Sequence, residues 1–195
     1  MNKGRVEAFS DGVIAILITI MVLELKIPHG ADLAALRPMI PVFLAYVLSY
    51  IILGIYWSNH HHMLHATKHV DGAMLWANLH LLFWLSLIPF ATAWMGDNHF
   101  AELPTSIYGA ILLLCAIAYT ILQNTIIARH GMSAEVARAL GRDVKGKISA
   151  LLYAAAIPLA FVHPGISGAL YVTVALIWLV PDRRIEKTLR EGTEG

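Results

Sequence analysis

Polar side chains open the first apolar segment of this chain, and they are the first residues whose types could do chemistry. Arg5, Glu7, Ser10 and Asp11 lie within about two helical turns of one another. If this helix spans a membrane, an ionised aspartate near its centre costs about 2.5–3.5 kcal/mol on insertion scales. Arg5 and Glu7 can extend into lipid headgroups from the end of the helix. Asp11 is shorter and lies deeper, so we expect it to have a protein partner.

Histidines form the second candidate group, at positions 60, 61, 62 and 65. His61 and His65 are one helical turn apart on the same face, a spacing that can hold a metal ion. No glutamate lies within this motif, and Lys68 follows closely. Interfacial histidines without a ligand explain the cluster better than a metal site at His60–His65, which remains the weakest alternative. We expect no metal, no cofactor and no enzymatic activity.

Further polar residues lie within or near apolar segments and could carry protons: Asp11, His80 and the pair Gln123-Asn124. They leave open a proton-coupled transporter or a proton leak pathway. Transporters often contain broken helices and internal repeats, and the sequence indicates neither. His80 is more simply explained as a hydrogen-bonded packing residue.

The composition indicates that lipid surrounds these residues. Of 195 residues, 58% are hydrophobic and 14% are charged, and the mean hydropathy is +0.66. A soluble domain carries about 25% charged residues. The net charge of +1 offers no basic surface for nucleic acid. The single cysteine, Cys115, excludes an internal disulfide.

Six apolar segments meet or approach the length of about 20 residues that a membrane-spanning helix needs. We therefore predict an all-α integral membrane protein with six transmembrane helices in one domain, 1–195. The last two spans are short, and the His163-Pro164-Gly165 break between them predicts a tight turn. A short cytosolic segment is expected at about 131–147 and a C-terminal tail at about 182–195. The predicted spans cover residues 5–27, 38–65, 73–95, 105–128, 148–162 and 166–180.

Loop charge predicts the orientation of these spans, because Lys and Arg gather on the cytoplasmic side. The stretch 129–147 holds five Lys or Arg residues and the tail holds four, whereas the loop 97–104 holds none. Both termini are therefore predicted to be cytoplasmic. Lys26 and Arg37, in the first external loop, are the exception to this pattern.

The first predicted helix has an apolar stripe with polar groups beside it. At about 100° per residue, Phe9, Ile16, Ile20 and Leu23 fall on one narrow stripe, which Arg5 shares. Thr19 lies next to the stripe, while Ser10 and Asp11 lie on its flanks. Periodicity alone is compatible with a stripe that faces lipid or a neighbouring helix.

A specific string occupies the start of this helix: Arg5-Val-Glu-Ala-Phe9-Ser10-Asp11, followed by an Ala/Ile-rich stretch through Ile16. It resembles the first-helix signature of the transmembrane protein 175 family, in which an arginine is followed after three residues by Phe-Ser-Asp. The resemblance is strong over the first half of the chain and rests on helix count in the second half. Further blocks that resemble the family are Tyr56-Trp57-Ser-Asn-His60-His61, Leu75-Trp76-Ala-Asn78-Leu79 and Pro89-Phe90-Ala-Thr92.

This resemblance implies a potassium-permeable channel, as found in animal endolysosomes and in bacterial membranes, with potassium as the permeant ion. Animal members also pass protons. The Thr-Val-Gly-Tyr-Gly filter of ordinary potassium channels is absent from the family and from this sequence. Animal members carry two six-helix repeats and work as dimers, so a single-repeat chain implies a homotetramer in the lipid bilayer. A single repeat fits a bacterial plasma membrane.

The resemblance also implies roles for particular residues around a central pore lined by the first helices. A hydrophobic constriction is expected at Ile16, Ile20 and Leu23, with Thr19 beside it and Ile16 as the narrowest ring. A structural motif that includes an Arg–Asp pair is expected to fix the rotation of the helix, at Arg5, Phe9, Ser10 and Asp11. A supporting polar shell behind the pore is expected at Trp57, His61 and Asn78.

Overall fold

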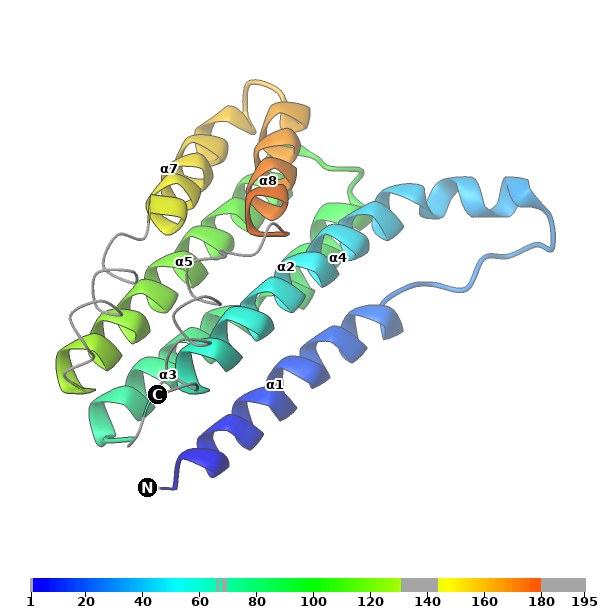
Figure 1. Ribbon diagram of the computed structural model, residues 1–195. Coiled ribbons are helices and arrows are strands. Elements are labelled where there is room, and N and C mark those ends of the chain that lie inside the picture. The colour runs from blue at the N-terminus through cyan, green and yellow to red at the C-terminus, as the bar shows by residue number, and fades with distance from the viewer. Residues whose placement is uncertain (1, 66, 68–69, 131–143, 180–195) are drawn as a thin grey trace.

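The computed structural model describes residues 2–65, 67, 70–130 and 144–179, and the elements within these ranges are all helical. A 3₁₀ helix, η1, leads directly into the second long helix (Figure 1). The elements in chain order are α1 (Lys3–Leu23), η1 (Leu33–Met39), α2 (Ile40–His65), α3 (Gly72–Leu85), α4 (Ile88–Asp97), α5 (Glu102–His130), α7 (Val144–Leu159) and α8 (Pro164–Leu179).

Within the described chain, the helices long and apolar enough to cross a membrane are Lys3–Leu23, Leu33–His65, Gly72–Asp97 and Glu102–Ala128. Helices α7 and α8 have 16 residues each, about 24 Å at the usual helical rise. They form an antiparallel hairpin (Figure 1). If α3 and α4 are counted as one interrupted span, the predicted all-α architecture of six helical segments is confirmed. The cytoplasmic placement of the termini remains a prediction.

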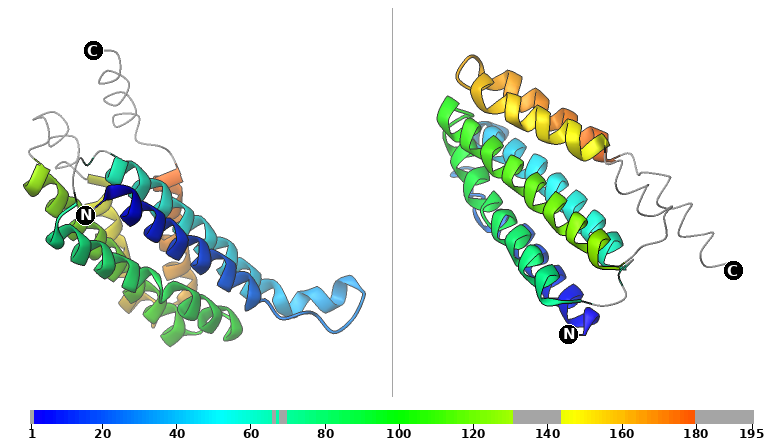
Figure 2. Two further views of the ribbon diagram at one scale, coloured as in Figure 1. Left: turned by 90° about the horizontal axis from the view of Figure 1, so that it is seen from below. Right: turned by 90° about the vertical axis from the view of Figure 1, so that its left-hand side faces the viewer.

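The bundle has α1 on one side and the α7–α8 hairpin on the other (Figures 1 and 2). Helix α1 packs on α2, α3 and α4, whereas α7 and α8 pack on α5, with α8 also contacting α2. The buried side of α1 follows helical spacing, with residues at Val6, Ser10, Ile14, Leu17 and Met21. Helix α1 is thus held along one side only.

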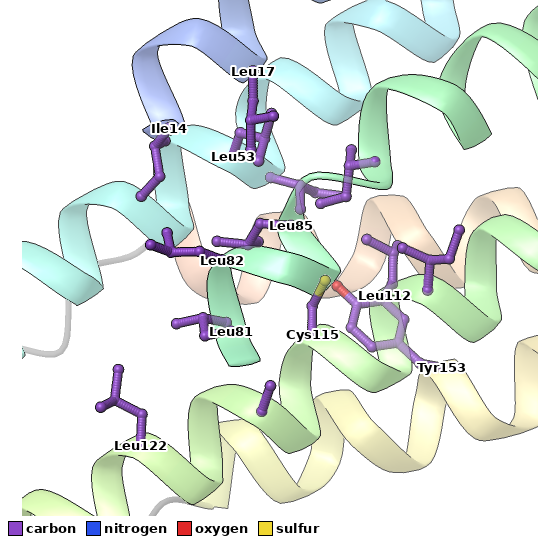
Figure 3. Packing of buried hydrophobic residues seen from close by; sticks show 14 of the residues in the cluster. Ile14, Leu17, Leu53, Leu81, Leu82, Leu85, Leu112, Cys115, Leu122 and Tyr153 are labelled. Atoms are coloured by element: carbon purple, nitrogen blue, oxygen red, sulfur yellow. The ribbon is translucent and has the colours of Figure 1, made fainter. Parts of the chain in front are cut away.

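Close packing of apolar side chains fixes the interior (Figure 3). Leu53, Leu81, Leu85 and Leu112 are fully buried, and so is Cys115. At Gly96 on α4 a Cβ atom would lie 2.8 Å from the Cα of Val42. Only glycine lets the backbones of α2 and α4 approach so closely.

The third predicted span, 73–95, is confirmed as the apolar segment Gly72–Asp97, but its helix is interrupted between Leu85 and Ile88 and is not continuous. Pro89 has no N–H to donate to the carbonyl of Leu85, and its ring crowds that carbonyl. Within the break, the Ser86 hydroxyl donates to the carbonyl of Phe83 at 2.6 Å. Backbone bonds continue across the break, from Leu87 N to Trp84 O and from Ala91 N to Leu87 O. The interruption is therefore a kink and not an unwound segment.

Two predicted boundaries also shift. Helix α1 ends at Leu23 and not at Ile27; the N–H of Glu24 still donates to the carbonyl of Ile20 at 3.3 Å, and the N–H of Leu25 closes a tighter turn on the carbonyl of Val22 at 3.2 Å. Helix α7 already begins at Val144, so the end of the predicted cytosolic segment belongs to that helix. The rest of that segment, 131–143, and the predicted tail, 182–195, lie outside the described residues.

Candidate pore helix and its polar support

The exposed side of α1 carries the predicted apolar stripe. In the single chain Ile16 is 57% exposed, Ile20 39% and Leu23 79%, and Phe9 and Arg5 are exposed on the same stripe. Thr19 is exposed beside them, and its Oγ1 donates to the carbonyl of Ile16 at 2.9 Å. This bond occupies the hydroxyl proton, so the oxygen of Thr19 is presented outward as an acceptor.

Small residues occupy the face of α1 directly opposite its buried side. At about 100° per residue, the buried residues and the small residues lie about 180° apart. Gly12 has nothing within 4 Å of the position that a Cβ would take. Such a face lets a neighbouring helix approach closely. The exposed small residues are Ala8, Gly12, Ala15 and Thr19.

A buried chain of hydrogen bonds joins α1 to α2 and α3. The amide Nδ2 of Asn78 donates to Ser10 Oγ at 2.9 Å, and Asn78 Oδ1 lies 2.7 Å from His60 Nε2. All three side chains are buried. Because Asn78 Oδ1 can only accept, His60 Nε2 is assigned as the donor in this pair. The chain orients α1 against the two helices behind it.

Asp11 has the protein partner that its depth in the helix requires. The indole Nε1 of Trp57 on α2 donates to Asp11 Oδ1 at 3.0 Å. A bond to a carboxylate is among the stronger hydrogen bonds. Together with Ser10, Asp11 ties α1 to its neighbours from two sides of the helix.

Arg5 does not pair with Asp11 within the described chain. The two residues are six positions apart, which places them about 120° apart around α1. Arg5 is exposed on the stripe side. The contacts at this end of the helix come instead from Lys3, whose Nζ donates to the carbonyl of His65 at 2.9 Å and lies 3.6 Å from Glu7.

His61, a predicted member of the polar shell, is exposed, and its neighbour His60 takes the buried position. The ring of His61 stacks between Trp57 and His65, with ring centroids 6.2 and 6.0 Å apart. His60 was not predicted as a member of the polar shell, although helical spacing puts it on the same face as Leu53 and Leu64, both buried. Within the described residues no group of three or more His, Cys, Asp or Glu side chains could hold a metal ion.

His80 and Trp84 form a separate pair on the exposed side of α3. Trp84 Nε1 donates to His80 Nε2 at 2.9 Å. An acceptor Nε2 means that Nδ1 carries the proton in this neutral tautomer. His80 is exposed and hydrogen-bonded within its own helix.

Sequence and fold relate this chain to known ion channels. A family profile described as "Endosomal/lysosomal potassium channel TMEM175" matches residues 5–89. A potassium channel of Chryseobacterium sp. (strain P1-3) is 55% identical over 192 residues, which cover 98% of this chain and 100% of that protein. The chain belongs to the transmembrane protein 175 family.

The fold is that of a TMEM175 channel. The crystal structure of a lysosomal potassium-selective channel TMEM175 homolog from Chamaesiphon minutus matches with a TM-score of 0.79 at 29% identity, covering 91% of this chain and 96% of that one. A TMEM175 protein of Gallus gallus, named an endosomal/lysosomal proton channel, is 33% identical over 132 residues, 61% of this chain but 26% of that protein.

Membership of the TMEM175 family settles the broad class of the molecule. The family is one of ion channels and not of enzymes. The chain is a multi-pass membrane protein, and its relatedness to a bacterial protein along its whole length places it in a bacterial membrane.

Proposed function

We propose that this chain is one subunit of a potassium-permeable channel in which ions move passively down their gradient. The pore is lined by the α1 helices of a homotetramer, and Ile16, Ile20 and Leu23 form its hydrophobic constriction. The observation that carries this proposal is the exposed apolar stripe of α1, which faces away from α2, α3 and α4, the helices of the described chain on which α1 packs.

The one-sided packing of α1 supports assembly around a common axis. A helix that faced only lipid would not need Ser10, Asp11 and Asn78 to fix its rotation. The small residues on the far face, from Ala8 to Thr19, allow neighbouring subunits to approach α1 closely. In a closed ring each α1 then offers one face to its own bundle, one to a neighbour and one to the axis.

Chemistry at the stripe supports a gate that works by excluding water. Rings of isoleucine and leucine side chains favour a dry constriction, and an ion must shed part of its hydration to pass. The bonded hydroxyl of Thr19 next to Ile16 adds oxygen atoms beside the apolar ring. Carbonyl oxygens of a Thr-Val-Gly-Tyr-Gly loop have no counterpart in this sequence.

The test is ion flux into liposomes that contain the purified protein, first under a potassium gradient and then under a sodium gradient. Ile16→Asn makes the proposed ring polar, so that water can enter it, and is expected to raise the flux or weaken the preference between potassium and sodium. Ile117→Asn is the matched control, because Ile117 is an exposed isoleucine on α5, away from α1. Unchanged flux and selectivity after Ile16, Ile20 and Leu23 are all replaced would refute the pore assignment.

Protons are a second candidate permeant species, because the related protein of Gallus gallus is named a proton channel. The same liposomes can report a change of internal pH under a proton gradient. Downhill proton movement through the wild type would extend the proposal to protons. Uphill movement of one ion driven by another would replace it with a proton-coupled transporter.

A further inference from the structure

A pocket lies between α2, α5, α7 and α8. The α7–α8 hairpin lies on the side of the bundle away from α1 (Figures 1 and 2). The empty volume of the pocket is about 490 Å³, part of which is open to the surroundings. Nothing in the proposed pore uses this space.

Apolar and aromatic side chains make up most of the lining. Tyr56 of α2 and Tyr119 of α5 meet edge to face, with ring centroids 6.1 Å apart. Trp178 of α8 is held in place by a bond of 2.9 Å from its Nε1 to Ser149 Oγ on α7. A lining of this kind suits a hydrocarbon chain and offers little to a hydrated ion.

Basic side chains flank the pocket at the first turn of α7. Gly146 lines the pocket, with Lys145 and Lys147 on either side of it in sequence. The Nζ of Lys145 lies 5.9 Å from the centroid of the Trp178 ring, so its charge is next to the lining. Lys147 is exposed. Positive charge therefore adjoins an apolar space.

We propose that this pocket binds an anionic phospholipid, with an acyl chain between α2 and the α7–α8 hairpin and the phosphate beside Lys145 and Lys147. Basic pockets between membrane helices take anionic headgroups in this way. The lipid would connect the short hairpin to the long helices α2 and α5. The inference needs only the membrane location of the chain and does not depend on the pore assignment.

The experiment is native mass spectrometry of the full-length protein in detergent, with phosphatidylglycerol or phosphatidylcholine of identical acyl chains added. The wild type is expected to retain phosphatidylglycerol in preference to phosphatidylcholine. Ala116→Leu fills the pocket from α5 and is expected to reduce retention of both lipids. Lys147→Gln is expected to lower the affinity for phosphatidylglycerol about fivefold, the change that corresponds to about 1 kcal/mol.

Two control variants separate this site from general effects of lipid. Ala169→Leu makes the same change on the exposed side of α8, outside the pocket, and Lys26→Gln removes a lysine that pairs with Asp97 far from it. Both are expected to bind lipid as the wild type does. The proposal is overturned if the wild type retains no lipid, because the pocket is then not a site for phospholipid. It is equally overturned if both lipids are retained alike, or if the controls lose as much binding as Ala116→Leu and Lys147→Gln.

Discussion

Removing the amide of Asn78 should destabilise the protein well beyond the loss of one side chain. Asn78 is 2% exposed and connects Ser10, 0% exposed, with His60, 1% exposed. Asn78→Ala leaves a buried hydroxyl and a buried imidazole N–H without their partner. The two groups belong to different helices, α1 and α2, so no single shift of one helix can satisfy both.

The size of the effect follows from these two orphaned groups. A buried polar group left unpaired costs about 1–3 kcal/mol, while hydrogen bonds between membrane helices average about 0.6 kcal/mol in double-mutant cycles. The lower end of the first range is therefore appropriate for each group, and the space left by the amide adds to it. We expect a loss of about 2–4 kcal/mol, which lowers the midpoint of thermal unfolding by about 4–16 °C in a chain of this size.

Thermal unfolding of the purified protein in detergent measures this loss. Asn98→Ala is the matched control, because Asn98 is exposed and its Nδ2 donates only to the carbonyl of Trp94, within its own turn. That change should stay within about 0.5 kcal/mol. Ser10→Ala combined with Asn78→Ala should cost less than the sum of the single changes. Equal midpoints for Asn78→Ala and Asn98→Ala, or strict additivity with Ser10→Ala, would show that the buried chain does not hold α1.

Two glycine substitutions test the packing and the assembly. Gly96→Ala places a Cβ 2.8 Å from the Cα of Val42 and should lower the unfolding midpoint by the equivalent of about 1–3 kcal/mol. Gly54→Ala is the control, because it has open space around it and should not lower the midpoint. Similar losses in the two variants would mean that α2 and α4 are not in close contact. Gly12→Leu should shift the proposed tetramer to smaller species in size-exclusion chromatography with light scattering, while Gly168→Leu on α8 should leave it intact. Unchanged assembly in the Gly12 variant would remove α1 from the subunit interface.

Helix number and the exposed stripe could be predicted from the sequence because both depend on hydrophobic periodicity. Four spans are long enough to be recognised by length alone, and Ile16, Ile20 and Leu23 share a stripe by spacing. Pro89, a proline inside an apolar run, was the signal for the kink in the sequence. Hydropathy averaged over many residues does not register a single proline. A window of about 19 residues reports a span and not its continuity.

The partners of the polar residues could not be predicted in the same way. Five consecutive polar positions near the end of α2, residues 58–62, all suit an interfacial helix end, and composition does not choose between His60 and His61. Tertiary packing decides which histidine is buried, because the buried face of α2 that includes Leu53 and Leu64 also includes position 60. Likewise Asp11 could in principle meet Arg5 or Trp57, and the rotation of α1 against α2 selects Trp57.

Two buried polar clusters, set apart along α2, account for the rigidity that the proposed pore requires. One joins Ser10, Asn78 and His60 near the start of α1. In the other, Ser49 Oγ lies 2.6 Å from Thr92 Oγ1 and 2.8 Å from the hydroxyl of Tyr108. The second cluster fixes α2, α4 and α5 to one another, and the first fixes α1 to the rigid body that results.

The direction of the exposed stripe then follows from the buried side of α1. Ser10 and Asp11 bond to partners on α3 and α2, so α1 cannot turn about its axis without breaking a bond to a buried or charged group. A helix rotates by about 100° per residue, and a slip of one position would replace Ile16 with Ala15 or Leu17 at the proposed ring. Ser10 and Asp11 of the Phe-Ser-Asp string therefore act on the stripe without belonging to it, because their polar side chains determine which side chains α1 turns away from its own bundle.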